Sequence, residues 1–429
     1  MRSPIWHPFT QHGLDEPTPL VSRAEGAALY TADGRRIIDA ISSWWVTTHG
    51  HRNPRIMAAI ADQAGRMDQI IFAGWTHEPA EALARALVEM MPAPLAHVFY
   101  SDSGSTSVEV AIKMALGYWL NRGEPRHRIL TLEHGYHGDT IGGMSVGARG
   151  VYNRAYTPLL FDVDTIPFPA SDGRNTLDAL EAMCRHEPAA LIVEPLVLGA
   201  GGMLFYEPAI LAEMRAICAR AGVLFIADEV MSGWGRTGTL LACDQAGIVP
   251  DILCLSKGLT GGAIPLAVTM TTAEIFDAHR STDRAQMLFH SSSYSANPIA
   301  CAAGLANLEI WRDEPVLDRV AMLGRRQQER LARLENVRNA RILGTIAACE
   351  LGSGTGDYLA AIGPGLLAFF RERDVLLRPM GDTVYVMPPY CISEPELDAV
   401  YEALAEAAMA FWSPTSTDRG AGHCPAQPL

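Results

Sequence analysis

Short apolar runs alternate with longer segments of helical period between about residues 97 and 272. Short runs rich in β-branched residues predict buried strands, and apolar residues that recur every three or four positions predict helices. Such alternation is typical of a mainly parallel sheet with helices on both faces. The predicted strands are HVFYS (97–101), RILTL (128–132), ALIVE (190–194), VLFIAD (223–228), ILCLS (252–256) and LAVTM (266–270).

The two ends of the chain predict a second, smaller domain of mixed helix and strand. A charged helical stretch covers residues 315–334, short strands and Gly-rich turns follow, and residues 394–412 have the pattern of an amphipathic helix. We therefore expect an α/β fold in which the N- and C-terminal segments pack together beside a large domain built on the sheet. The expected division is 1–54 and 315–412 for the small domain, 55–314 for the large domain and 413–429 for a disordered tail.

Composition and charge exclude several classes of protein. Of the 429 residues, 48% are apolar, which suits a large buried core, and the formal net charge of −14 argues against a broad grip on nucleic acid or anionic lipid. No apolar run approaches the roughly 18 residues of a membrane span, and the N-terminus lacks the apolar core of a signal peptide. We expect a soluble, cytoplasmic protein. The eight cysteines form no C-x-x-C pair and no zinc-type spacing, so we expect reduced thiols and no metal site.

Lysine is unusually rare in this sequence. Of the 34 basic residues only Lys113 and Lys257 are lysines, so a reaction that needs an amine has two candidates. Lys257 directly follows a predicted buried strand and precedes glycines, and desolvation there would lower its pKa and raise its nucleophilicity. Lys113 lies inside a predicted helix, where its chain is expected to run along the helix surface to solvent.

The segment after the first predicted strand favours a phosphate group. Thr106 and Glu109 fit a capping box, and Gly104 and Ser105 would place backbone N–H groups and a hydroxyl at the positive end of a helix. The alternative is a capped helix that binds no ligand. The segment matches neither G-x-G-x-x-G nor Walker A, which argues against dinucleotide and ATP phosphate loops.

Two further residues suit a flat heteroaromatic ring. Tyr136, in the turn GYHGDT (135–140), could stack on such a ring, or it could be an ordinary half-buried loop residue. Asp228 ends a buried strand, where a carboxylate needs a cationic or hydrogen-bonding partner, so it is either a ring-nitrogen ligand or a structural ion pair. A phosphate cradle, a stacking ring, an acid and an amine are together the four contacts that pyridoxal phosphate requires.

The sequence resembles the class III, fold-type I aminotransferases over about residues 4–412. The likeness is carried by DSGS (102–105), GYHGDT (135–140), IADEV (226–230), SKGLTGG (256–262) and SANPIACAA (295–303). The resemblance implies that Lys257 holds pyridoxal 5′-phosphate, that Asp228 bonds the pyridine nitrogen, that Tyr136 stacks on the ring and that Gly104 and Ser105 bind the phosphate.

Within this class the sequence is most similar to the branch that acts in biotin biosynthesis. The discriminating segments are IWHPFTQ (5–11), ISSWWVTTHG (41–50) and LLRPMGDTVYVMPPY (376–390). The resemblance implies transfer of an amino group from S-adenosylmethionine to 7-keto-8-aminopelargonate. It implies that Trp44 walls the substrate pocket and that Arg378 meets the substrate carboxylate. The full expected substrate set is Phe9, Trp44, Tyr136, Lys257, Ser291, Arg378 and Tyr385.

The resemblance also implies a homodimer with shared active sites. In the class, a short loop of the partner subunit completes the phosphate site, and here this loop is His290–Tyr294, with Ser292 and Ser293 as the expected cofactor contacts. Two positions depart from the usual pattern, because Phe9 replaces a tyrosine and Ser291–Ser293 replace Gly-Pro-Thr. Loss of the tyrosine hydroxyl leaves open whether the amino donor is S-adenosylmethionine, lysine or another amine.

Two alternatives remain at this point. The first is another class III aminotransferase that acts on an ω-amino acid or a simple amine with pyruvate. The second is a non-catalytic, aminotransferase-like binding module, against which the retained Lys257 argues.

Overall fold

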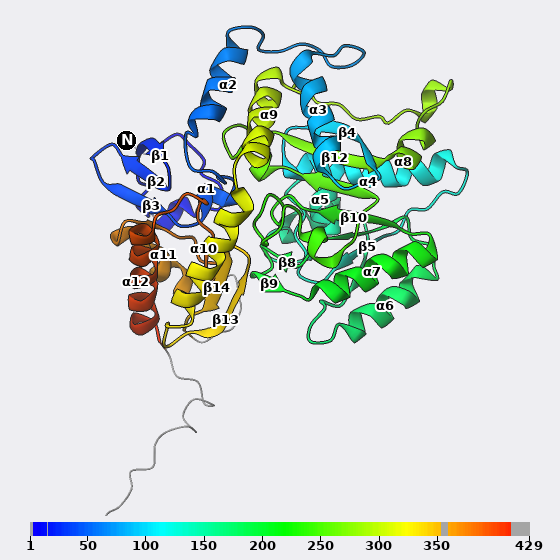
Figure 1. Cartoon of the computed structure of the whole chain (residues 1–429). Coiled ribbons are helices and arrows are strands. Elements are labelled where there is room, and N and C mark those ends of the chain that lie inside the picture. The colour runs from blue at the N-terminus through cyan, green and yellow to red at the C-terminus, as the bar shows by residue number, and fades with distance from the viewer. Residues whose placement is uncertain (1–2, 15, 353–358, 413–429) are drawn as a thin grey trace, which may run out of the picture.

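A seven-stranded sheet forms the centre of the larger part of the molecule, on the right of Figure 1. The computed structural model describes residues 3–14, 16–352 and 359–412, so the predicted tail at 413–429 lies outside the described residues. The strand order is β4 (Leu95–Ser101), β12 (Ala267–Thr272), β11 (Ile252–Leu255), β10 (Leu224–Asp228), β7 (Ala190–Val193), β5 (Ile129–Leu132) and β6 (Asp164–Ile166).

The sheet is mainly parallel, which confirms the predicted fold class. Strands β11, β10, β7, β5 and β6 run parallel, whereas β12 is antiparallel to both of its neighbours, β11 and β4. All six predicted strands are present within one or two residues at each end, and the short strand β6 was not predicted. Because parallel strands end at the same edge, the residues that follow β7, β10 and β11 are brought close together.

Both faces of the sheet are buried, as the continuous apolar runs require. In β10, Phe225 and Ala227 pack into the cluster that contains helix α7 (Pro208–Ala221), while Ile226 packs with helix α4 (Gly104–Asn121) on the opposite face. This alternation follows from the two-residue period of a strand.

The N- and C-terminal segments form the smaller part of the molecule, on the left of Figure 1. Strand β3 (Arg36–Asp39) pairs in parallel with β15 (Val375–Leu376), which joins the two ends of the chain in one sheet. The remaining strands here are β1 (Val21–Glu25), β2 (Ala28–Thr31), β13 (Arg338–Leu343), β14 (Ile346–Glu350) and β16 (Thr383–Val386), with helices α10 (Val316–Leu331), α11 (Ile362–Glu372) and α12 (Glu394–Ala410).

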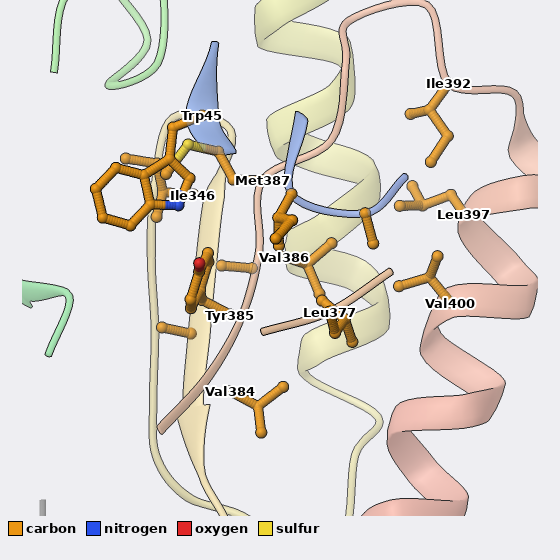
Figure 2. Packing of buried hydrophobic residues seen from close by; sticks show 14 of the residues in the cluster. Trp45, Ile346, Leu377, Val384, Tyr385, Val386, Met387, Ile392, Leu397 and Val400 are labelled. Carbon is orange, nitrogen blue, oxygen red and sulfur yellow. The ribbon is translucent and has the colours of Figure 1, made fainter. Parts of the chain in front are cut away.

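Figure 2 shows Val386 and Leu377 on the side of the core that faces Leu397 and Val400 of α12, while Met387 lies beside Trp45. The predicted domain boundaries at residues 54 and 314 stay predictions.

Helices α2 (Pro54–Ala64), α3 (Glu78–Met90) and α9 (Pro298–Asp313) lie together at the top of Figure 1. The shorter elements are the helices α1 (Ser42–Trp45), α5 (Ile141–Val146), α6 (Arg174–Cys184) and α8 (Ala273–Ala278), the strands β8 (Val197–Leu198) and β9 (Leu204–Phe205), and 3-10 turns at His12–Leu14, Arg154–Leu159, Ala242–Ala246, Lys257–Thr260 and Arg284–Gln286.

Among the described residues, no helix combines the length and the apolar character needed to cross a bilayer. All seven described cysteines are free.

Candidate active site

Lys257 follows strand β11 after one intervening residue, Ser256, at the edge of the sheet where the parallel strands end. It begins the 3-10 turn Lys257–Thr260, and its φ of 35° is in the left-handed region that a non-glycine residue rarely adopts. Its Nζ lies 5.2 Å from the ring centroid of Trp45. Desolvation lowers the pKa of Lys257, and the negative charges of Asp228 and Glu194 partly oppose that shift. The site therefore holds an amine that gives up its proton more readily than an exposed lysine.

Asp228, the last residue of β10, is a buried carboxylate with defined partners. Its Oδ2 lies 2.7 Å from Nδ1 of His137, and its Oδ1 accepts a hydrogen bond from the backbone N–H of Val230 at 3.1 Å. The other ring nitrogen of His137, Nε2, is buried without a hydrogen-bond partner among the described residues. The pairing keeps an acidic group in place at the carboxyl edge of the sheet.

Glu194 is a second buried acid next to the site, just after β7. Its two carboxyl oxygens accept hydrogen bonds from the backbone N–H groups of Tyr136 (2.9 Å) and Gly199 (3.0 Å). Burial, with a further contribution from the charge of Asp228, raises the pKa of Glu194 to about 7, while His137 opposes this shift. Glu194 thereby fixes the backbone of the loop that carries Tyr136.

A cavity of about 140 Å³ brings together five of the predicted cofactor residues, namely Gly104, Ser105, Tyr136, Asp228 and Lys257. Its full lining is Trp45, Gly104, Ser105, Tyr136, His137, Gly138, Glu194, Asp228, Val230, Met231 and Lys257. Helix α4 starts at this cavity, so the N–H groups of its first turn and the positive end of its dipole face the same space.

The predicted capping box at Thr106 and Glu109 is wrong. The cap residue is Ser103, whose Oγ accepts the N–H of Thr106 at 3.2 Å, while the Thr106 hydroxyl accepts the N–H of Ser103 at 3.0 Å. Because the helix begins at Gly104, Glu109 lies a turn further on and accepts the N–H of Gly142 at 2.6 Å. Gly104 and Ser105 therefore still lie in the first turn of the helix, where its N–H groups can bind a phosphate.

Two glycines are needed for the close approach of loops around this cavity. Gly138 has φ of 108°, and a Cβ on it would lie 2.1 Å from Ser105 Oγ. A Cβ on Gly104 would lie 2.5 Å from Cγ1 of Val230. A side chain at either position would therefore require the loop or its neighbour to shift.

A second cavity, of about 340 Å³, adjoins the first through Tyr136, Trp45 and Lys257. It contains all the predicted substrate residues except Ser291. Nη2 of Arg378 donates to the carbonyl of Phe9 at 2.9 Å, and its guanidinium lies 5.2 Å from the Trp44 ring. The full lining is Phe9, Trp44, Trp45, Val46, Tyr136, Asp139, Tyr152, Ala200, Lys257, Arg378, Pro379, Met380 and Tyr385.

The aromatic wall of this cavity is held by neighbouring groups. The Phe9 and Trp44 rings lie 5.5 Å apart, and the Trp45 and Tyr385 rings meet edge to face at 5.9 Å. Figure 2 shows Tyr385 beneath Trp45. The tryptophan pair follows Ser43, whose φ is 60° and whose N–H and hydroxyl bond to the buried carboxylate of Asp39.

The three loop serines do not line either cavity of their own chain. Ser292 Oγ donates to Oδ2 of Asp102 at 2.6 Å, and the carbonyl of Ser293 accepts from Nε2 of Gln69 at 2.6 Å. The hydroxyl of Ser291 contacts only the neighbouring carbonyl of Ser292, at 3.4 Å, among the described residues. Their expected contact with a partner subunit stays a prediction.

Sequence reasoning missed several residues of the site. Glu194 and His137 had usable signals, since Glu194 ends a buried strand as Asp228 does and His137 lies in the turn that contains Tyr136. Tyr152 and Met380, which line the larger cavity, lie in irregular segments whose pattern gave no such signal.

The comparisons with known proteins show the family of this chain. The family model described as aminotransferase class-III matches residues 9–408, and the chain belongs to this family. The adenosylmethionine-8-amino-7-oxononanoate aminotransferase of Synechococcus elongatus is 47% identical over 94% of this chain and 97% of its own length. The protein of the same name from Mycobacterium leprae is 40% identical over 94% of each chain.

Solved structures share the whole fold. The adenosylmethionine-8-amino-7-oxononanoate aminotransferase of Methanocaldococcus jannaschii superposes with a TM-score of 0.90 at 34% identity, covering 95% of this chain and 97% of that one. A PLP-bound amine transaminase from an uncultivated Pseudomonas species gives a TM-score of 0.89 at 33% identity, covering 96% and 100%. Fold similarity alone therefore does not separate these two activities.

Proposed function

We propose that this protein is a pyridoxal-phosphate-dependent aminotransferase of biotin biosynthesis. It transfers an amino group from S-adenosylmethionine to 7-keto-8-aminopelargonate (8-amino-7-oxononanoate) and releases 7,8-diaminopelargonate. The observation that carries the proposal is the larger cavity, where Trp44, Arg378 and Tyr385 meet Lys257. The relatives that carry this enzyme's name support it, because they match almost the full length of both chains.

The smaller cavity fits pyridoxal 5′-phosphate. A buried carboxylate, a helix N-terminus with a hydroxyl, and a partly buried amine lie around one space, and Gly138 brings its loop so close to Ser105 that no Cβ would fit between them. Gly104 and Ser105 would hold the phosphate and Asp228 the ring nitrogen. Tyr136 would cover the ring, and Lys257 would supply the amine for covalent attachment. When bound, the cofactor supplies an electron sink that acidifies the substrate carbon bearing the amino group.

The residues of the chain would then move and hold protons. The Nζ of Lys257 would take the proton from the amino-bearing carbon of the donor and, as the ammonium form, would later give a proton to the carbonyl carbon of the keto substrate. Its lowered pKa suits this exchange, because the amine must both accept and release a proton near neutral pH. Asp228, held by His137 at 2.7 Å, would keep the ring nitrogen protonated.

The larger cavity would orient both substrates in turn. The guanidinium of Arg378, fixed by the Phe9 carbonyl and the Trp44 ring, would pair with a substrate carboxylate. The rings of Phe9 and Trp44 would lie along the aliphatic chain of the keto substrate and exclude water from it.

We also propose a homodimer in which each active site receives the loop His290–Tyr294 from the partner. This loop is anchored on its own chain, because the ammonium of Lys113 bonds to the carbonyl of Phe289, and Ser292 bonds to Asp102. Phe289 and Tyr294, which flank the serines, are 60% and 65% exposed. Large apolar side chains that protrude in this way are typical of surfaces covered by another subunit.

Mixing two inactive variants tests the shared site. In a heterodimer of Lys257→Ala with a triple Ala variant at Ser291, Ser292 and Ser293, one of the two sites would receive an intact lysine and intact serines. We expect activity to return on mixing after subunit exchange. If the variants fold and exchange subunits but stay inactive, the sites are not shared.

The activity itself is tested by product formation. Purified protein loaded with pyridoxal 5′-phosphate is incubated with S-adenosylmethionine and 7-keto-8-aminopelargonate, and 7,8-diaminopelargonate is measured by mass spectrometry. We expect product with the wild-type protein and none with Lys257→Ala. Growth on medium without biotin of a strain that lacks this step but produces the present protein checks the same function in cells. We propose the cytoplasm as the location of the protein because both substrates are soluble metabolites.

A second candidate is an amine or ω-amino acid transaminase that uses pyruvate. Phe9, which lacks the hydroxyl of the usual tyrosine, and the similarity to the amine transaminase structure favour this candidate. A panel of donors separates the two candidates: we expect S-adenosylmethionine to exceed lysine and simple amines, and the reverse order would support the second candidate. Any measurable half-reaction excludes a non-catalytic binding module.

A further inference from the structure

Asn307, on the buried side of helix α9, bonds to the turn that carries Lys257. The side chain is fully buried, and its Nδ2 donates to the carbonyl oxygens of Gly258 at 3.1 Å and Leu259 at 3.0 Å. These are the two residues that directly follow Lys257. One amide from a separate helix therefore holds two consecutive carbonyl groups of the turn.

The orientation of the Asn307 amide is fixed by its surroundings. Two carbonyl oxygens face the same amide atom, so the NH₂ group must lie there, since the amide oxygen would be repelled by both. On the other side, a Cβ on Gly261 would lie 3.3 Å from Asn307 Oδ1 and 3.8 Å from Cδ2 of His49. Burial lowers the pKa of His49 to about 4, so at pH 7 this ring places no positive charge behind the turn.

The turn needs such support because its backbone is strained. Lys257 has φ of 35°, a conformation that persists in a non-glycine residue only where surrounding contacts hold it. Within the loop, Ser256 Oγ donates to the carbonyl of Leu266 at 2.9 Å, and Thr260 Oγ1 donates to that of Ile264 at 2.7 Å. Both of these contacts are local, whereas Asn307 ties the turn to helix α9.

We propose that Asn307 is a positioning residue for Lys257, which holds the strained turn so that the lysine Nζ faces Asp228 and the cofactor cavity. This inference rests on the proposed function of Lys257. Without the amide, two buried carbonyls would lose a donor, and the turn would rotate to find other partners. Nζ would then change its degree of burial, which is the main cause of its lowered pKa, and its distance from the charged groups of Asp228, Glu194 and Arg236.

The test compares three single variants of the full-length, cofactor-loaded protein. Asn307→Leu keeps the approximate shape and removes both donors. Asn307→Asp keeps the shape, and its carboxyl can donate to one carbonyl only when it is protonated. Gln327→Leu is the matched control, because Gln327 is also fully buried and its Nε2 donates to a backbone carbonyl, that of Thr345 at 2.7 Å, away from both cavities.

Three quantities are measured on each variant: the melting temperature, the pH midpoint of the visible cofactor absorbance, and the rate of the half-reaction with the amino donor. We expect Asn307→Leu to displace the midpoint by at least about half a pH unit and to slow the chemical step about tenfold to hundredfold, with the apparent Kd of the donor changed less than about threefold. Gln327→Leu is expected to lower the melting temperature and to leave the midpoint and the half-reaction at wild-type values.

A wild-type midpoint and half-reaction rate in Asn307→Leu would overturn the proposal, as would the same changes in Gln327→Leu. If Asn307→Leu does not fold, the pH dependence of the half-reaction rate of Asn307→Asp tests the proposal instead. Its rate relative to wild type should rise as the pH falls from about 8 to 6, because protonation restores one donor to the buried carbonyls, and a constant ratio would overturn the proposal. Lys257→Ala tests the role of Lys257 separately from that of Asn307, since unchanged cofactor absorbance together with wild-type turnover in that variant would refute the role of Lys257 itself.

Discussion

Asp228 and His137 form a buried pair in which the carboxylate Oδ2 and the ring Nδ1 lie 2.7 Å apart. The aspartate comes from the end of strand β10 and the histidine from the loop that also carries Tyr136. The pair therefore links the acid proposed for the ring nitrogen to the loop proposed to cover the ring, and it restricts the carboxylate to one orientation.

We expect Asp228→Asn to fold and to bind the cofactor but to lose at least about a hundredfold in rate, because a neutral amide cannot hold a proton on the pyridine nitrogen. His137→Asn, which leaves the acid in place, should cost less, about tenfold. Steady-state rates and circular dichroism of the two variants check this. Normal turnover in Asp228→Asn would contradict the role given to Asp228.

Arg378 is expected to recognise the carboxylate of the keto substrate. We expect Arg378→Ala to raise the KM for 7-keto-8-aminopelargonate about tenfold to hundredfold, because a charge-assisted pair is lost. The methyl ester of the same substrate provides the matched probe, since it lacks the negative charge. An equal increase in KM for the acid and for the ester would show that Arg378 contributes to packing and does not bind the carboxylate.

The carboxylate of Asp39 is expected to hold the tryptophan pair in position. It accepts the N–H groups of Ile41 (3.2 Å) and Ser43 (2.7 Å) and lies 2.8 Å from Nε2 of His51. We expect Asp39→Ala to lower stability by about 2 to 3 kcal/mol and to raise KM, because the buried donors lose their acceptor and the segment before Trp44 relaxes. Asp62→Ala, at an exposed position on α2, is the control. An unchanged KM would show that the strained backbone holds its shape without Asp39.

Glu194 gives the protein a pH-dependent stability. Its pKa in the folded state is about 7, against an ordinary value of 4.5, so the folded chain binds this proton more tightly than the unfolded chain. The resulting stabilisation is complete below about pH 4.5 and is lost as the pH rises through about 7, a change on the order of 3 kcal/mol.

Glu194→Gln should therefore flatten this dependence. We expect the free energy of unfolding of cofactor-free wild type to fall more steeply between pH 5 and 8 than that of the variant, as measured by urea titration. Glu229, which burial shifts in the same direction, leaves a residual slope in both proteins. Identical slopes would mean that Glu194 keeps its ordinary pKa in the folded protein.

The sequence predicted those parts of the site that follow buried strands. Lys257 and Asp228 each lie at the end of an apolar run, and in a parallel sheet such positions share one edge. Their proximity could therefore be inferred without the family resemblance. Phe9, Arg378 and Tyr385 come from opposite ends of the chain, and only the family resemblance related them to this edge.

Other features of the fold and the site could not be predicted, and each has a physical reason. The antiparallel direction of β12 leaves no trace in an apolar run, because a buried strand has the same pattern in either direction. The capping box was misplaced because the helix begins at Gly104, three positions after Ser101 ends β4. Asn307 lies in an apolar helical stretch, where the sequence alone does not distinguish a polar residue that bonds a turn from one that faces solvent.

Reductive trapping of the cofactor tests the central claim most directly, because the chain contains only two lysines. The purified, cofactor-loaded protein is treated with borohydride, digested and analysed by mass spectrometry. We predict that the peptide containing Lys257 gains the mass of the pyridoxyl phosphate group and that the peptide containing Lys113 does not. A modified Lys113 with an unmodified Lys257, or a fully active protein in which neither lysine is modified, would contradict the account.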